Sequence, residues 1–447
     1  MKSNGWDEDE LVRWGGEAGI CVHRPPRRPA TEFRHNYETD FGRFLVRRPA
    51  LVIEPGSVTE LAAAMRALGE RTIGYKLRGA GHSSGGQVLI EGGVVIELSG
   101  LRGIVDRGDT VDVLGGTTWL EVAEHLHPRR RPPVLTDNLR TTVAGTLAVG
   151  GIGDTSIHDG LQIASVIELD WVAPDGTSRT LTQADEELGF VLAGRGQLGA
   201  IARVRLPTIA RPPLLAGHIA AWTSVDAYLE AAAVIRRERS YEVVRATLFW
   251  RADGSTAVRA ILANFVDEEP PADDPGLAPL RCTTSAVIPA SDRLASQRVD
   301  PVASWDYVCP ALELALPLDD RGVAAWREIE RRIVASGLRD VLPDGVALAV
   351  VAAADARLPL APLPVAQNGM FVALRPQVAT PSDAVRWLPV LHELADIALA
   401  CGGRIYLMSI ELDRPDFLDR QFGGALGRFR ELKRWHDPAG VCNPGLL

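Results

Sequence analysis

Arg78-Gly-Ala-Gly-His-Ser-Ser-Gly-Gly-Gln87 is the stretch around which the rest of the chain is organised. An apolar, strand-like run from Thr72 to Leu77 precedes it, and a second such run, Gly93 to Leu98, follows it. Four glycines in ten residues allow positive φ angles and a close approach of the backbone to a ligand. We interpret the stretch as a loop that wraps the phosphates of a large cofactor and places His82 beside it. The alternative is a glycine-rich connection with a chance histidine.

Bulk composition is that of an ordinary folded protein. The 447 residues predict two or three domains, and 46% hydrophobic with 23% charged residues is a typical globular balance. The net charge of −9 gives no general attraction to nucleic acid or anionic membranes. No apolar run approaches the roughly 20 residues that span a bilayer, and the first ten residues are not a secretory signal.

The five cysteines are scattered and include no CxxC pair. This pattern argues against a disulfide framework or a zinc site and is typical of a reducing cytoplasm. The histidines show no metal spacing either. We therefore expect a cytoplasmic protein with no metal site, which interacts with neither nucleic acid nor membranes.

Strands and helices alternate through the first half of the chain, as they do in a mixed α/β or α+β domain. Ser57 with Glu60 has the spacing of a capping box, and Thr118 with Glu121 repeats it. Two more glycine-rich segments follow at 142–153 and 193–201. The predicted elements are a strand at 51–54, a helix at 57–69, a hairpin at 104–114 turning near Gly108, a helix after Thr118, strands at 162–173, 178–181 and 201–206, and a linker at 207–213.

The second half of the chain predicts another α+β domain, a sheet with helices. Asp253-Gly254 between two apolar runs is a strong hairpin signal, and Gly337 is well suited to end a helix. The predicted elements are a helix capped by Thr223, strands at 243–250 and 257–265, a surface loop at 267–279, a helix at 323–336, strands at 346–353 and 371–376, a helix at 382–400 disturbed by Pro389, and a strand at 404–408.

Several enzyme classes do not fit these motifs. Three glycine-rich loops in one domain are too many for a dinucleotide fold with a single GxGxxG, and the element after Gly81 is a strand instead of a helix. No glycine loop contains the Gly-Lys-Ser/Thr of a P-loop. A serine hydrolase would need a G-x-S-x-G elbow, which is lacking.

The motifs together resemble the FAD-linked oxidases of the vanillyl-alcohol oxidase type, and among these most the cytokinin dehydrogenases. The resemblance covers about 50–206 and the C-terminal tail, while about 210–400 match only weakly. The matching stretches are RGAGHSSGGQ (78–87), GGVVIEL (92–98), LTDNLRTTVAGTLAVGGIG (135–153), HDGLQIASVIELDWV (158–172), GRGQLGAIARVRL (194–206) and DPAGVCNPG (437–445).

The resemblance implies an α+β fold: a two-subdomain FAD-binding domain of the PCMH type, and a substrate domain of antiparallel sheet with helices. The implied boundaries are an N-terminal arm at 1–48, the FAD-binding domain at 49–208, the substrate domain at 209–402 and a C-terminal return at 403–447. It also implies FAD bonded covalently to His82, by a single link because 142–160 contain no cysteine. The implied cofactor-binding residues are Arg78, Gly79, Ala80, Gly81, His82, Ser83, Gln87, Thr142, Gly145, Ile152, Ile201 and Asn443.

Asp137 is the catalytic residue that the resemblance implies. Removing hydride from a carbon next to nitrogen builds positive charge, and a carboxylate within reach takes the amine proton and stabilises the cation. The alternative is an aspartate that only begins a turn before Asn138.

Three departures from the family pattern concern the flavin edge and the pocket. The family's serine in the second glycine loop is Ala148, its terminal glutamine is Leu446, and its late tyrosine falls at about Ile410. These changes bear more on the identity of the substrate than on the identity of the cofactor.

We therefore expect an FAD-dependent oxidase or dehydrogenase that removes hydride from a C–N or C–O bond of a small organic molecule. Oxygen or another acceptor would then take the electrons. Alternatives are a biosynthetic tailoring oxidase or sugar oxidase of the same fold and, more distantly, a flavin-binding module without turnover. The aromatic residues Trp250, Trp305 and Phe371 mildly favour a flat apolar substrate, although such residues are more often core. The oligomeric state stays open.

Overall fold

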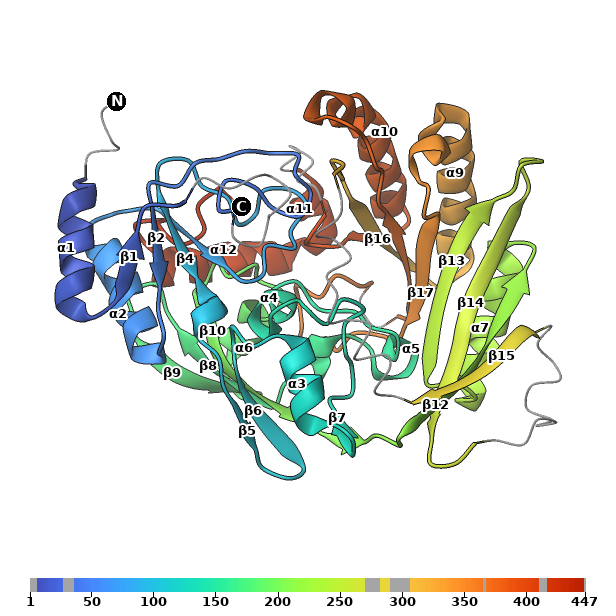
Figure 1. Cartoon of the computed structure of the whole chain (residues 1–447). Helices are drawn as coiled ribbons and strands as arrows, with labels where there is room; N and C mark the ends of the chain where they lie inside the picture. The colour runs from blue at the N-terminus through green and yellow to red at the C-terminus, as the bar shows by residue number, and fades with distance from the viewer. Residues whose placement is uncertain are drawn as a thin grey trace.

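The structure is a computed structural model, and it describes residues 6–26, 36–269, 282–289, 306–364, 367–409 and 416–445. Its strands form three sheets, of four, five and eight strands. A two-stranded ribbon consists of β7 (Arg130–Arg131) and β11 (Ile209–Ala210). Figure 1 shows the two smaller sheets on one side of the molecule and the eight-stranded sheet on the other. The predicted α+β class is confirmed, and the second half of the chain forms a sheet of its own.

The first sheet carries the glycine-rich stretch. β2 and β3 both run parallel to β4, and β1 pairs antiparallel with β2. Helix α2 packs on it through Leu61, Met65 and Leu68, and Ser57 accepts a hydrogen bond from Glu60 N, as the capping motif predicted. The elements are α1 (Glu8–Ala18), β1 (Cys21–His23), β2 (Leu51–Glu54), α2 (Val58–Glu70), β3 (Tyr75–Arg78) and β4 (Val94–Glu97).

The second sheet is antiparallel throughout, in the order β5-β6-β10-β8-β9. Its hairpin at Gly108 and the capping box at Thr118 form as predicted. The predicted strand at 162–173 is wrong in its first part, where a 3-10 helix covers Gln162–Ser165. The elements are β5 (Ile104–Asp106), β6 (Thr110–Leu114), α3 (Trp119–Leu126), α4 (Val143–Leu147), α5 (Ser156–Asp159), β8 (Glu168–Val172), β9 (Ser178–Thr182), α6 (Glu186–Val191) and β10 (Ala200–Pro207).

The large sheet is an eight-stranded antiparallel sheet in the order β15-β12-β14-β13-β17-β18-β16-β19. Helices α7, α9 and α10 cover one face (Figure 1), which buries Leu248, Val350 and Val372. The elements are β12 (Leu214–Trp222), α7 (Val225–Glu238), β13 (Val243–Trp250), β14 (Thr256–Val266), β15 (Cys282–Pro289), β16 (Leu312–Pro317), α9 (Asp320–Ser336), β17 (Val346–Val351), β18 (Gly369–Leu374), α10 (Pro381–Ala400) and β19 (Arg404–Ile405).

The opposite face of the large sheet turns toward the first half of the chain, because side chains alternate along a strand. Ala315, Phe371 and Ala373 from this face share one buried cluster with Leu147 and Leu161. The two halves therefore meet across this face of the sheet.

Several predictions for the second half differ from the structure in detail. Helix α10 continues through Pro389, because the carbonyl that loses its partner belongs to Val385, which is 53% exposed and can be hydrated. Ser224 caps α7 where Thr223 was predicted, and the strand predicted at 404–408 ends at Ile405. The predicted linker at 207–213 contains β11. The sequence analysis did not predict strands β12 and β16. It also did not predict the two helices near the C-terminus, α11 (Asp416–Phe422) and α12 (Gly424–His436).

The described part of the N-terminal region contains regular structure and supports the glycine-rich stretch. It contains α1 and β1, and residues 36–44 pack beneath the glycine-rich stretch. Three positions and one loop named in the sequence analysis lie outside the described residues: Trp305, Ile410, Leu446 and most of the loop at 267–279.

Candidate active site

The glycine loop, residues 78–87, follows β3 and rests on residues 40–42. Phe41 N donates to Gly81 O at 2.9 Å, and Gly42 N donates to Ser83 O at 3.2 Å. Asp40 accepts from the Ser83 hydroxyl at 2.9 Å and from Gly86 N at 2.8 Å. Burial raises the pKa of Asp40 to about 6, against the lowering effect of these two donors. The N-terminal segment thus determines the shape of the loop.

Arg78 supports the loop from within the protein. Its side chain is fully buried, lies 3.6 Å from Glu97 and donates to the main-chain oxygens of Asn36 and Thr39. Burial raises the pKa of Glu97 to about 7, although the Arg78 charge opposes the rise. Any contact of Arg78 with a cofactor would therefore come from its main chain.

Main-chain donors are available on the loop. Among the described residues, the N–H groups of Gly79, Ala80, Gly81 and Ser83 donate to no recorded protein acceptor. Gly81 has a φ of 72°, which lets consecutive N–H groups point to one side. Such a set of donors fits a bound phosphate or flavin oxygen, so these residues fit an FAD.

The second and third glycine-rich segments and the C-terminal tail converge on this loop. Asn443 accepts from Leu77 N at 2.8 Å and donates to Arg195 O at 2.9 Å, so it joins the first segment to the third. Gly79 lies against Thr142 at the start of the second segment. Tyr75 N donates to Val441 O, which holds the tail beside β3.

Gln87 and the second glycine segment also contact residues 406–409. Gln87 Nε2 donates to Ser409 O at 2.6 Å, and Gly151 N donates to the Tyr406 hydroxyl at 3.0 Å. Burial raises the pKa of Tyr406 well above its usual value. The loop and the large sheet are thus joined through the residues that follow β19.

The stretch that contains Asp137 contacts His82, although the two residues are 55 positions apart in the chain. Asn138 Nδ2 lies 3.0 Å from His82 Nε2, and Phe41 stacks on the His82 ring at a centroid distance of 6.1 Å. Asp137 is the residue directly before Asn138. The residue next to the predicted proton acceptor is therefore in contact with the predicted anchor.

Asp137 reaches the large sheet. Its Oδ1 lies 2.7 Å from Nη1 of Arg245 on β13, and the two side chains are 45% and 52% exposed. Nearby, Glu313 of β16 is 2% exposed and accepts from Arg375 Nε and Nη2 at 3.1 and 2.8 Å. Burial acts to lower the pKa of Arg375, but Glu313 outweighs it and Asp137 adds to the rise.

The other predicted site residues lie around the same segments. Thr142 is buried and caps α4 by accepting from Gly145 N, and Gly145 itself is exposed. Ile152 is half-buried within the second segment, Ile201 is 4% exposed in β10, and Ala148 ends α4. Their contacts with a flavin stay predictions. Trp250 packs on the helix side of the large sheet, whereas Phe371 lies on the opposite side, 5.4 Å from the Tyr406 ring.

Sequence reasoning missed the charged residues that the fold adds to the site. Asp40, Arg245, Glu313 and Arg375 lie in stretches that match the family only weakly or not at all, and each is brought in by tertiary contacts. The alternating pattern of β13, with Arg245 between apolar residues, was the one available signal. This pattern indicates the face of the strand on which Arg245 lies, but not the residue that its side chain contacts.

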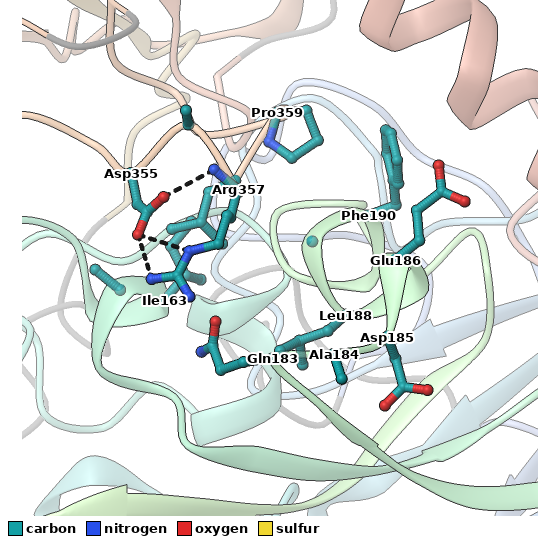
Figure 2. A pocket seen from close by; sticks show the side chains of 14 residues that line it. Ile163, Gln183, Ala184, Asp185, Glu186, Leu188, Phe190, Asp355, Arg357 and Pro359 are labelled. Carbon is teal, nitrogen blue, oxygen red and sulfur yellow. Dashed lines mark hydrogen bonds and ion pairs between the residues drawn. The ribbon is translucent and has the colours of Figure 1, made fainter.

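Two further features lie away from the glycine loop. Figure 2 shows a cavity of about 350 Å³ beside α6, lined by Ile163, Gln183 and Phe190 and by an Asp355–Arg357 pair, and no predicted site residue lines it. On the first sheet, ligand atoms of Cys21, His23 and Glu54 lie within 4.8 Å of one another. The sequence analysis expected no such grouping, because β1 and β2 create it by pairing.

Comparison with known proteins agrees with this geometry. Residues 49–182 match the family described as FAD binding domain. An uncharacterized oxidoreductase encoded in the fasciation locus of Rhodococcoides fascians is 28% identical over 91% of this chain and 95% of its own length. The chain is an FAD-dependent oxidoreductase.

Cytokinin dehydrogenases are also similar to this oxidoreductase, over a shorter stretch. Cytokinin dehydrogenase 7 of Oryza sativa subsp. japonica is 34% identical over 46% of the chain and 41% of its own length. Cytokinin dehydrogenase 2 of Arabidopsis thaliana is 36% identical over 37% of the chain and 35% of its own length. The matched region thus spans less than half of these relatives.

No helix in the described part of the oxidoreductase combines the length and apolar character needed to cross a membrane.

Proposed function

We propose that this oxidoreductase removes hydride from a C–N bond of a small organic molecule, in the manner of a cytokinin dehydrogenase, with FAD attached to His82. The observation that carries the proposal is the contact between His82 and Asn138, the residue directly after Asp137. N6-prenylated adenine is the first substrate to test. A C–O bond of an alcohol is the nearest variant of the same chemistry.

Each residue has a defined part in this proposal. The N–H groups of the glycine loop bind the cofactor, and His82 anchors it, with Phe41 and Asn138 holding the imidazole in place. Bound FAD supplies the acceptor for the hydride. Asp137 takes the amine proton and stabilises the positive charge that develops on the substrate. Arg245 holds the Asp137 carboxylate before the substrate arrives.

A biosynthetic tailoring oxidase or sugar oxidase of the same fold is the second candidate. The charged surroundings of Asp137 favour it over an enzyme for purely apolar amines, since Arg245 and Arg375 both lie near that carboxylate.

A cytoplasmic location is also part of the proposal. The four cysteines that the structure describes fully, Cys21, Cys309, Cys401 and Cys442, are all free, which supports a reducing compartment.

Acid precipitation of the purified protein tests the attachment. Flavin colour should remain in the pellet of the wild type and appear in the supernatant, or be lost, for His82→Ala. Colour only in the wild-type supernatant would refute the covalent link, whereas a colourless preparation would count against the cofactor itself.

Anaerobic mixing with N6-prenylated adenine, simple amines, alcohols and sugars tests the reaction. Bleaching of the flavin by the prenylated adenine or another amine supports C–N oxidation. Bleaching by alcohols or sugars alone would move the assignment to the second candidate. Oxygen and artificial acceptors can then be compared for the return of colour.

A further inference from the structure

We infer that Arg245 selects substrates that carry an anionic group, a carboxylate or a phosphate, in addition to the bond that is oxidised. The inference rests on the proposed function, because it takes Asp137 as the proton acceptor of the site. It assigns to Arg245 a role in specificity that the matched FAD binding domain, residues 49–182, does not contain.

Arg245 has more hydrogen-bonding capacity than its surroundings use. A guanidinium carries five N–H donors, and among the described residues Asp137 is the one recorded partner of Arg245. The side chain is 52% exposed, although it lies on the sheet face that turns toward the glycine loop. Planar, bidentate binding of a carboxylate or phosphate is the chemistry that such a group serves best.

The charge balance of the site changes when the proposed reaction proceeds. Arg245 and Arg375 carry two positive charges, and Asp137 and Glu313 carry two negative ones. Glu313 is buried and stays paired with Arg375. Once Asp137 takes a proton, Arg245 loses its counter-charge, and a negative group on the substrate would restore it. An anionic substrate is therefore favoured most at the stage where the proton has moved.

The surface beside Arg245 is suited to a flat apolar group. Thr247 pairs with Ala347 across β13 and β17, and Ala349 lies two positions further along on the same face. These three side chains are small and half-buried, and we call them the small-residue platform. A substrate could lie on the platform with its anionic group at Arg245 and its C–N bond at Asp137.

Two matched pairs of probes separate the sources of negative charge. An N6-prenylated adenosine and its 5′-monophosphate differ only in the phosphate, and N-benzylglycine and its methyl ester differ in the carboxylate. Steady-state kcat/KM is measured for all four with the wild type, Arg245→Met and Arg245→Lys. Arg327→Met is the control, because Arg327 forms a comparable half-exposed pair with Asp226, at 2.6 Å, on the helix side of the sheet.

Wild type should prefer the anionic member of at least one pair, and the preferred pair identifies phosphate or carboxylate. Arg245→Met should lower kcat/KM for that anionic probe about 30-fold more than for its neutral partner, with part of the extra loss in kcat because the anion is held most strongly once Asp137 is protonated. Arg245→Lys should recover part of the loss, and Arg327→Met should resemble the wild type. Equal losses for both members of a pair, or no wild-type preference in either pair, would overturn the inference.

A binding measurement keeps the two hypotheses distinguishable. Isothermal titration of the 5′-monophosphate and of N-benzylglycine into the flavin-loaded wild type and Arg245→Met does not depend on turnover. If no probe is oxidised but one of them binds only when Arg245 is present, the proposed function fails and the anion site stands. If the variant binds both as the wild type does, the anion site fails.

Discussion

The glycine loop and the Arg245 face of the large sheet form opposite sides of one candidate site, but they are built in different ways. The loop is made mainly of backbone: its shape depends on glycine φ angles and on main-chain bonds to Phe41 and Gly42. The sheet face acts through charged side chains on separate strands, Arg245 on β13 and Glu313 on β16. A short sequence motif is enough to predict a loop of this kind. The sheet face cannot be predicted in that way, because it forms only when the strands pair.

Asp137→Asn is expected to have the largest effect, because it removes the proton acceptor at the junction of the two regions. The amide keeps a similar shape but cannot take the proton, so kcat should fall by about 10²- to 10⁴-fold while the flavin stays bound. Rapid mixing with substrate under anaerobic conditions measures the rate of flavin reduction. Asp226→Asn, which removes a similar exposed partner of an arginine, should behave as the wild type. Unchanged reduction by Asp137→Asn would exclude the proton-acceptor role.

Asp40→Asn tests the support beneath the glycine loop through pH. The pKa of Asp40 is raised to about 6, so between about pH 4 and 6 the folded protein holds a proton that the unfolded chain has released. This group therefore lowers the free energy of unfolding as the pH rises, by up to about 2 to 3 kcal/mol. The variant should lose that part of the slope in denaturant titrations at several pH values. Identical slopes for both proteins would contradict the expectation.

Gly81→Ala tests the loop conformation itself. Gly81 has a φ of 72°, and a Cβ there would lie 2.9 Å from Cζ of the buried Arg78. We expect a loss of about 2 kcal/mol in the free energy of unfolding, together with weaker flavin retention. Gly254→Ala is the matched control, since Gly254 has a φ of 81° in a hairpin with open space around it and should lose only about 1 kcal/mol. Similar losses at both positions would mean that the Arg78 contact matters little.

Ser57→Ala should have the smallest effect and shows what a local contact contributes by comparison. The serine side chain caps α2 by accepting from Glu60 N at 3.2 Å, so its removal should cost about 1 kcal/mol and leave flavin reduction unchanged. Thermal unfolding and anaerobic reduction measure the two quantities. A clear change in reduction rate would show that α2 influences the site.

Local sequence signals predicted those parts of the fold that neighbouring residues control. The caps at Ser57 and Thr118, the hairpins at Gly108 and Gly254 and the end of α9 at Gly337 all depend on bonds within a few residues, and all form as predicted. The prediction failed where packing decides, as at 162–165, where a 3-10 helix takes the place of the predicted strand. Strands β12 and β16 were missed because their partners lie far away in sequence.

For the site, the sequence by itself determined the FAD binding domain, the glycine loop with His82, and Asp137 as the candidate acid–base residue. Those features depend on residue types that are adjacent in the chain. Only the tertiary structure brought Asn138 to His82, Asp40 under the loop and Arg245 to Asp137. The physical reason is that charges and hydrogen bonds act over a few ångströms of space, and chain separations of 46 to 108 residues carry no local signal of such contacts.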